Sequence, residues 1–266
     1  MKRNTLSLFS MVVLLSFFVG CTVNNVKIDD KLGDVFKGKG VEGTFGIFDN
    51  SRGKFTIYNL DRFKSPYSPG ETFNIFNTLV GMHTGKIADE NEKINYRLEK
   101  ESADTVTIGE AYKSYSTDHF KALANYIGKD TMKFWVDSVK YGNMKIGKAV
   151  DEFWSNGSIL ISADEQLGFI KRLYFKQLPF RASVQEKLKK LLIIDNNSQF
   201  QLAYQLGTAT DKNKLIYWVM GWIEENRHVY PFVLNFSIDQ GTDAKQLSKD
   251  LTLDALKYLG FFKWKM

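Results

Sequence analysis

Residue patterns typical of β-strands lie towards both ends of this 266-residue chain, and patterns with helical period fill the stretch from about 66 to 200. Two β-rich runs, 43–48 and 54–58, flank the turn-forming residues 49–53 and therefore predict a hairpin. After the helical stretch, strand patterns return in 202–210, 215–223 and 228–238. Strands at both ends can pair in one sheet and leave the middle as a helical lobe. The chain is therefore predicted to adopt an α+β fold, with an antiparallel sheet built from both termini and an inserted helical lobe.

Apolar residues inside the middle stretch recur with the spacing of helix faces. Phe73, Phe76 and Val80, for example, lie on one side of a helix predicted over 72–80. A last amphipathic helix is predicted at about 244–259, because its apolar residues recur every four positions. With 44% hydrophobic and 25% charged residues, the chain has enough apolar material for a substantial core, and this excludes disorder.

The first twenty residues belong to another category. Lys2 and Arg3 precede an apolar run, 6–19, that is shorter than the ~20 residues needed to span a bilayer. The run ends at Gly20-Cys21, which resembles the lipobox of bacterial lipoproteins, where the thiol is acylated and the preceding peptide is removed. An ordinary signal peptide, or an anchor helix with an incidental cysteine, is the alternative. Because Cys21 is the only cysteine, disulfides within the chain and cysteine metal clusters are excluded.

On this interpretation, residues 1–20 are a lipoprotein signal peptide, 21–40 a polar tether and 41–266 the folded domain. We expect the protein to be exported and lipid-anchored to the bacterial cell envelope, on its periplasmic or cell-surface side, with the membrane as one partner. Removal of Lys2 and Arg3 reduces the 36 basic residues to 34, against 30 acidic residues. So small a surplus, without basic and aromatic residues clustered together, excludes a nucleic-acid partner.

Residue types that hold metals or cofactors are scattered along the chain. The three histidines, His83, His119 and His228, are isolated from one another and lack metal-ligand spacing. A glycine-rich phosphate-binding loop is absent from the sequence. We therefore predict neither a metal nor a cofactor, and interpret the histidines as surface or core residues.

Five segments, taken in order, carry a family resemblance. They are Glu42–Phe45; Tyr67–Asn77 with Thr84-Gly85 and Asp89–Glu92; Tyr141–Asn143; Phe153-Trp154 with Ile161–Ala163; and Tyr217–Glu224. Together they are similar to the class D, oxacillinase-type, serine β-lactamases, with matching gaps from about 42 to 260. The resemblance implies the penicillin-recognising serine enzyme fold, which agrees with the arrangement of strands and helices expected above.

The resemblance fails at the nucleophile. The family carries Ser-x-x-Lys at the start of a buried helix, where residues three apart share a face and the lysine, carbamylated in class D enzymes, serves as the base. Here Glu71 stands at the serine position and Asn74 at the lysine position. A carboxylate forms no stable acyl ester, and an amide is not a base near neutral pH. The resemblance therefore leaves no catalytic residue to be expected.

Other registers do not restore the motif. Thr72 would need a lysine where Ile75 stands, and Ser68 would need one at Glu71. One literal match, Ser51-Arg52-Gly53-Lys54, lies in the predicted hairpin turn and away from any helix start. We interpret that match as chance.

The second and third family motifs are also degenerate. The Ser-x-Val serine stands thirteen residues before the glycine of an Ile-Gly pair, and this spacing leads to Tyr115; Ser116, one place on, would point elsewhere in the same helix register. The Lys-Thr/Ser-Gly motif aligns with Gln205, Leu206 and Gly207, so that only its glycine is kept. The resemblance makes these residues pocket positions without the groups that relay protons.

The resemblance also implies a pocket that is cationic in the family. Its carboxylate-binding arginine aligns with Ser248, although Lys245 or Lys249 could substitute. With Asn74 and Gln205 at lysine positions, and an acidic residue at the serine position, anion binding should be weakened by several powers of ten. A full charge at ~4 Å is worth on the order of 4 kcal/mol at an effective dielectric constant of 20.

Some pocket positions keep the family's residues. They are Tyr141, Gly142, Asn143 and Trp154, which shape and pack the pocket walls in the family. A large aromatic ring or a tight turn can be kept for folding alone, so we interpret these residues as architectural.

The leading hypothesis is a catalytically inactive β-lactamase-like envelope lipoprotein that acts as a binding or interaction module. Its ligand would be neutral or cationic, or its partner another envelope protein. The alternative is a β-lactam-binding or β-lactam-hydrolysing enzyme with divergent chemistry, in which Glu71, beside Tyr115, has a raised pKa and transfers protons. Glu71 could also simply stabilise the first turn of its helix. A decayed paralogue without selected activity fits the sequence as well as the first hypothesis.

Overall fold

A seven-stranded sheet crosses the molecule, with strand order β1-β3-β2-β9-β8-β7-β6. The computed structural model describes residues 25–93, 106–114, 116–211, 214–239 and 244–263. Neighbouring strands of the sheet are antiparallel except β1 and β3, which are parallel. The strands are β1 (Val26–Ile28), β2 (Glu42–Asp49), β3 (Lys54–Tyr58), β6 (Ile193–Asn196), β7 (Phe200–Asp211), β8 (Lys214–Glu225) and β9 (His228–Asp239).

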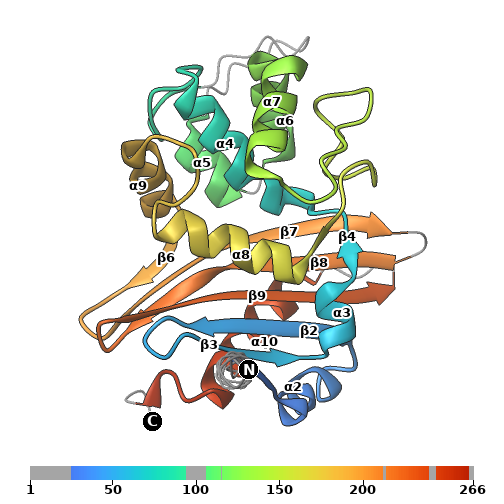
Figure 1. Cartoon of the computed structure of the whole chain (residues 1–266), viewed down its shortest axis with the longest axis vertical. Coiled ribbons are helices and arrows are strands. Elements are labelled where there is room, and N and C mark those ends of the chain that lie inside the picture. Colours follow the sequence, from blue (N-terminus) through green and yellow to red (C-terminus); the bar gives the residue numbers. More distant parts are fainter. Residues whose placement is uncertain (1–24, 94–105, 115, 212–213, 240–243, 264–266) are drawn as a thin grey trace, which may run out of the picture.

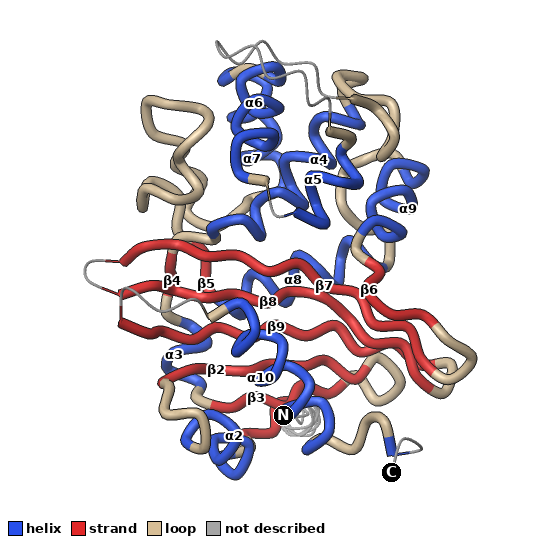
Figure 2. The backbone as a smooth tube through the Cα atoms, turned by 180° about the vertical axis from the view of Figure 1, so that it is seen from behind, coloured by secondary structure: helices blue, strands red, loops and turns tan. Residues whose placement is uncertain are grey.

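Helices cover both faces of the sheet (Figures 1 and 2). The lobe between β3 and β6 contains α3 (Leu60–Lys64), the short 3₁₀ helix η2 (Gly70–Thr72), α4 (Phe73–His83), α5 (Ile108–Ser114), α6 (Thr117–Ile127), α7 (Lys129–Val139), α8 (Ala163–Tyr174) and α9 (Ala182–Leu191). It also holds a small sheet of β4 (Pro66–Tyr67) and β5 (Ile161–Ser162). Packed near the other face are η1 (Asp30–Leu32), α2 (Gly33–Lys37) and α10 (Lys245–Tyr258).

The sheet is assembled from the two ends of the described chain. Strand β2 pairs with β3 on one side and with β9 on the other, so that Phe45 lies opposite both Tyr58 and Leu234. Strands β8 and β9 form the hairpin expected around 224–227, and both residues of its turn, Asn226 and Arg227, have positive φ. That conformation matches the right-handed twist of the flanking strands. The predicted α+β fold is confirmed.

Burial on the two sides of the sheet explains why its long strands are apolar throughout. Trp218 and Val219 are neighbours on β8 and both are fully buried. Trp218 belongs to the core cluster shared with the helical lobe, whereas Val219 belongs to the cluster shared with α10. Because successive side chains point to opposite faces, a strand covered on both sides needs apolar residues at every position.

The first described residues correct the expected tether at 21–40. Val26 pairs with Phe55 through β1 and β3, and Leu32 and Phe36 are fully buried. The folded body therefore includes residues from Val26 onward and does not begin at 41. The polar composition of this stretch concealed two apolar anchors that are four residues apart, one helical turn. Residues 1–24, which include the predicted signal peptide and Cys21, lie outside the described residues.

The longest helix among the described residues, α10, has 14 residues. Among these residues, no helix combines the length and the apolar character that crossing a membrane requires.

Candidate functional site

The site is built where η2 touches β7. Gly70 has φ +55°, and a Cβ placed on it would lie 2.3 Å from the carbonyl oxygen of Thr208. A Cβ on Gly207 would lie 2.6 Å from the backbone nitrogen of Thr72. Glycine at both positions is what allows the strand and the turn to approach so closely. This contact explains why Gly207 is present although the rest of its motif is not.

Glu71 points from η2 across this contact to the strand. Its Oε2 accepts a hydrogen bond from the Thr208 N–H, with 2.5 Å between nitrogen and oxygen. Burial raises the pKa of the Glu71 carboxyl above its ordinary value; the hydrogen bonds from the Thr208 N–H and its own N–H, and the charge of Lys245, oppose that rise. The Glu71 carboxylate, at the family's nucleophile position, is therefore hydrogen-bonded to the backbone of β7. The side chain of Thr72, the N-cap residue of α4, makes no capping hydrogen bond to that helix.

A small cavity of about 80 Å³ opens beside Glu71. Its lining residues come from η2, α6, β7, β8 and α10: Glu71, Thr117, Leu206, Gly207, Thr208, Tyr217, Lys245 and Ser248. Sites for drug-sized ligands have volumes of about 300–1,000 Å³. This cavity is therefore large enough only for a small group or for the tip of a side chain.

Helix α10 forms the wall of the cavity on which the family's carboxylate-binding arginine is expected. Ser248 is buried, and its hydroxyl donates to the carbonyl of Ala244 at 2.8 Å. Lys245, one turn earlier and exposed, brings a positive charge to the same wall, whereas Lys249 does not line the cavity. Of the three positions considered from the sequence, Ser248 and Lys245 therefore meet Glu71 at the cavity.

The two motif residues before Gly207 separate in the structure. Leu206 lines the cavity with an apolar side chain. Gln205 is buried and is not among the lining residues; its amide donates to the carbonyl of Leu206 at 3.0 Å. Of the β7 residues that line the cavity, Leu206, Gly207 and Thr208, none is cationic.

Asn74 lies apart from the cavity, fully buried in α4. Among the described residues, neither its side-chain nitrogen nor its side-chain oxygen has a hydrogen-bond partner, although its backbone carbonyl accepts from the Tyr112 hydroxyl at 2.8 Å. The Ser68 hydroxyl and Asn77 Oδ1 also lack partners within the part of the chain that the structure describes. A buried unpaired polar group costs about 1–3 kcal/mol. The residue at the family's base position therefore offers no base, and on this count its unpaired amide is expected to lower the stability of the fold.

A chain of buried hydrogen bonds joins η2 to Gln166 of α8 and to Tyr141. The Tyr141 hydroxyl donates to Gln166 Oε1 at 3.2 Å, and Gln166 Nε2 donates to the Thr72 hydroxyl at 2.9 Å. Thr72 in turn donates to the carbonyl of Pro69 at 2.6 Å. Gln166 was not expected from the sequence, and Thr72 was considered there only as a possible nucleophile. The available signal was a single amide, Gln166, on the apolar face of α8 beside Leu167.

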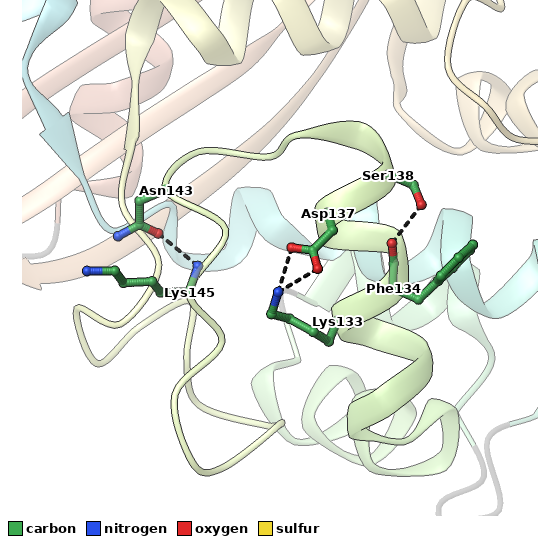
Figure 3. A network of polar contacts seen from close by, with 6 residues as sticks. All are labelled: Lys133, Phe134, Asp137, Ser138, Asn143 and Lys145. Carbon is green, nitrogen blue, oxygen red and sulfur yellow. Dashed lines mark hydrogen bonds and ion pairs between the residues drawn. The ribbon is translucent and has the colours of Figure 1, made fainter.

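Gly142 and Asn143 clamp a loop and do not line the cavity. Gly142 has φ +53°, and a Cβ on it would lie 2.2 Å from the carbonyl oxygen of Leu160. Asn143 Oδ1 accepts from the N–H of Lys145 at 3.1 Å and of Leu160 at 3.2 Å, and its amide donates to the carbonyl of Ser158 at 3.1 Å. Figure 3 shows the contact with Lys145 and, separately, the ion pair between Lys133 and Asp137 on α7.

Trp154 packs against the start of α4. Its ring stacks on Phe73 with centroids 5.2 Å apart and planes 11° apart, and its carbonyl accepts from the Gly70 N–H at 2.9 Å. We call Tyr141, Gly142, Asn143 and Trp154 the loop frame: the rings of Tyr141 and Trp154 pack on Phe73 at the start of α4, whereas Gly142 and Asn143 hold the loop at 158–160. Tyr115 lies outside the described residues. Within the described ranges, no three or more His, Cys, Asp or Glu residues gather where they could hold a metal ion.

Comparisons with known proteins agree with this geometry. The family model of the penicillin binding protein transpeptidase domain matches residues 43–256. The probable β-lactamase YbxI of Bacillus subtilis is 30% identical over 90% of this chain and 86% of its own length. The class D β-lactamase FUS-1 (OXA-85) of Fusobacterium nucleatum subsp. polymorphum superposes with a TM-score of 0.81 at 31% identity, covering 89% of this chain and 100% of the other.

A receptor domain shares the fold. The C-terminal domain of the BlaR penicillin-receptor of Bacillus licheniformis superposes with a TM-score of 0.79 at 23% identity, covering 90% of this chain and 98% of the other. At that identity the likeness concerns the fold alone.

Proposed function

This chain belongs to the class D β-lactamase family of penicillin-binding transpeptidase domains, and from that premise we propose that it binds a ligand or partner without forming an acyl-enzyme. One observation carries the proposal. The residue at the nucleophile position is Glu71, and its carboxylate already accepts the hydrogen bond of the Thr208 N–H. The group that would have to attack is therefore absent, and a backbone donor beside it is already bonded.

The bonded donor affects charge stabilisation. Acyl transfer depends on backbone N–H groups aimed at the oxygen on which negative charge develops. In this chain the Thr208 N–H is satisfied by a carboxylate, which carries the same charge as that oxygen would. An incoming carbonyl would have to displace Glu71 and then develop its charge nearby, and the repulsion at ~4 Å is on the order of 4 kcal/mol at an effective dielectric constant of 20.

Proton transfer lacks its base as well. Asn74 is an uncharged amide, fully buried and outside the cavity. Groups that act as a catalytic unit lose most of their effect when one member is missing, so the joint absence of nucleophile and base leaves little covalent turnover.

The cavity favours a neutral or cationic group as its occupant. Glu71 contributes a negative charge that Lys245 offsets only in part, because Lys245 is exposed to solvent and its field is screened there. With about 80 Å³ available, the occupant is a small ligand or a protruding side chain of another envelope protein. That the BlaR domain is a penicillin-receptor supports the use of this fold for binding.

Hydrolysis of the chromogenic cephalosporin nitrocefin tests the absence of turnover. Purified residues 22–266 should hydrolyse it no faster than buffer does. Turnover near ~10 per second, typical of enzymes, would overturn the proposal.

We further propose that the chain is an exported envelope lipoprotein anchored at Cys21. The apolar run that ends at Gly20-Cys21 supports this, and β1 follows within a few residues. Metabolic labelling with an alkyne analogue of palmitate should mark the wild type and spare Cys21→Ser. Equal labelling of the two would show the anchor to lie elsewhere.

The second candidate is a β-lactam-binding or β-lactam-hydrolysing enzyme with divergent chemistry. Two observations favour it: the names of the relatives, and the raised pKa of the Glu71 carboxyl, which suits proton transfer. In that case Glu71 would act as general base on a water molecule, and Glu71→Gln would abolish activity. If the chain has no hydrolytic activity, the wild type and Glu71→Gln are equally inactive, and this outcome separates the two candidates.

A further inference from the structure

A second and larger cavity lies between the beginning of β7 and the end of α10. Its volume is about 670 Å³, and it shares no lining residue with the cavity at Glu71. Phe200, Leu202 and Tyr204 of β7 form one wall, with Leu253 and Phe261 on the other. We call it the α10 groove. Its size falls within the range of small-molecule sites, about 300–1,000 Å³.

Part of its wall is held in a fixed, strained conformation. Phe262 has φ +62°, a conformation that costs a residue other than glycine about 1 kcal/mol or more. Its N–H donates to Oε1 of the buried Glu225 at 3.1 Å, and its ring meets the Phe200 ring edge-on with centroids 5.0 Å apart. A buried carboxylate and an aromatic contact therefore keep this wall in place, so the groove is a built feature of the fold.

Charged side chains stand at the edge of the apolar walls. Lys257 and Lys263 are exposed lining residues, and Asp195 is the acidic one. Lys257 also has Asp254 at 3.8 Å, a long contact between two well-exposed side chains that contributes little. Among the lining groups, two positive charges thus stand against one negative charge, beside aromatic and aliphatic carbon.

We propose that the α10 groove binds a free long-chain fatty acid, with the chain against the β7 wall and the carboxylate beside Lys257 and Lys263. If each carbon of the chain, with its hydrogens, takes up about the same volume as one water molecule in the liquid, roughly 30 Å³, a chain of ~16 carbons needs about 480 Å³. The groove of about 670 Å³ holds one such chain. This site is independent of the proposed function, because no residue of the Glu71 cavity takes part.

Calorimetric titration of residues 22–266, which contain every described element, tests the proposal with two single-chain ligands used below their micelle concentrations. Dodecanoate should bind one to one and saturate. Dodecyltrimethylammonium has the same chain with the opposite charge and should bind at least tenfold more weakly. Equal affinity for the two would overturn the proposal, because the lysines would then play no part.

Variants locate the site. Leu253→Trp fills the groove and should weaken dodecanoate binding at least tenfold. The double variant Lys257→Glu with Lys263→Glu should reverse the preference between the two ligands, and this outcome does not depend on how well Leu253→Trp folds. Lys190→Glu, an exposed charge reversal on α9, is the control and should leave both affinities unchanged.

Other occupants would be recognised in the same experiments. If the ligand-free protein formed a dimer that Leu253→Trp dissociates, the groove would belong to a second copy of the chain. If dodecanoate bound only to a chain ending at Lys263, the last three residues would be the occupant. Either result, or dodecanoate binding that Leu253→Trp leaves intact, would overturn the fatty-acid proposal.

Discussion

The loop frame and the contact between η2 and β7 lie next to each other, yet they relate to their family in opposite ways. The loop frame keeps the family's residues Tyr141, Gly142, Asn143 and Trp154, and each of them has a packing or hydrogen-bonding partner. The contact between η2 and β7 keeps Gly207, which the close approach requires, and has replaced the chemical groups around it. The difference teaches that steric and hydrogen-bonding requirements of the fold can persist when the requirements of a reaction do not.

Breaking the loop frame should have the largest effect. Gly142→Ala places a Cβ 2.2 Å from the Leu160 carbonyl at a positive φ, and we expect a loss of about 3 kcal/mol in the free energy of unfolding. Gly53→Ala is the matched control, because Gly53 also has a positive φ but an added Cβ meets nothing within 4 Å. It should lose only about 1 kcal/mol. Urea denaturation of both variants measures the difference, and equal losses would show that the Leu160 contact does not matter.

Two buried amides near these regions, Gln166 on α8 and Asn74 on α4, sharpen the comparison when each is replaced by leucine. Gln166→Leu removes the acceptor of the Tyr141 hydroxyl and the donor to the Thr72 hydroxyl, which keeps its bond to the Pro69 carbonyl, and should lower the free energy of unfolding by about 1–3 kcal/mol. Asn74→Leu removes an amide that has no partner among the described residues and should raise the free energy of unfolding by about 1 kcal/mol. Thermal denaturation of the two variants measures whether the free energy of unfolding falls for Gln166→Leu and rises for Asn74→Leu. Destabilisation by Asn74→Leu would mean that Asn74 has partners the structure does not show.

Much of the fold could be predicted because it depends on the side-chain pattern. The hairpin of β8 and β9 and helix α10 follow from apolar spacing, and the structure has them within a residue or two of the predicted bounds. Residues 26–37 were mistaken for a tether because two isolated apolar residues, Leu32 and Phe36, anchor an otherwise polar stretch.

The site was less predictable, for a physical reason. Its decisive donor is the backbone N–H of Thr208, and no residue type announces a backbone donor in a sequence. The pocket assignment of Gln205 came from alignment alone, whereas the structure turns its amide towards the backbone of Leu206. Glu71 and Asn74 were identifiable because the family motif fixes their spacing.

The smallest expected effect concerns pH. Because burial raises the pKa of Glu71, the folded state holds its proton to a higher pH than the unfolded state, whose carboxyl has a pKa near 4.5. As pH rises from 4.5 through the folded pKa, the wild type should therefore lose stability relative to Glu71→Gln. Urea denaturation of both across that window measures the difference, which stays constant above the window. A difference that does not change between pH 4 and 8 would show that the Glu71 carboxyl is not destabilised by burial.

Intact-protein mass spectrometry after incubation with benzylpenicillin tests the central claim most directly, namely that the engaged carboxylate of Glu71 prevents acylation. An active class D β-lactamase made deacylation-deficient serves as the positive control. We expect residues 22–266 to keep their unmodified mass throughout the incubation, at benzylpenicillin concentrations up to the millimolar range. A mass increase of one penicillin molecule, mapped by peptide analysis to the segment around Glu71, would contradict it.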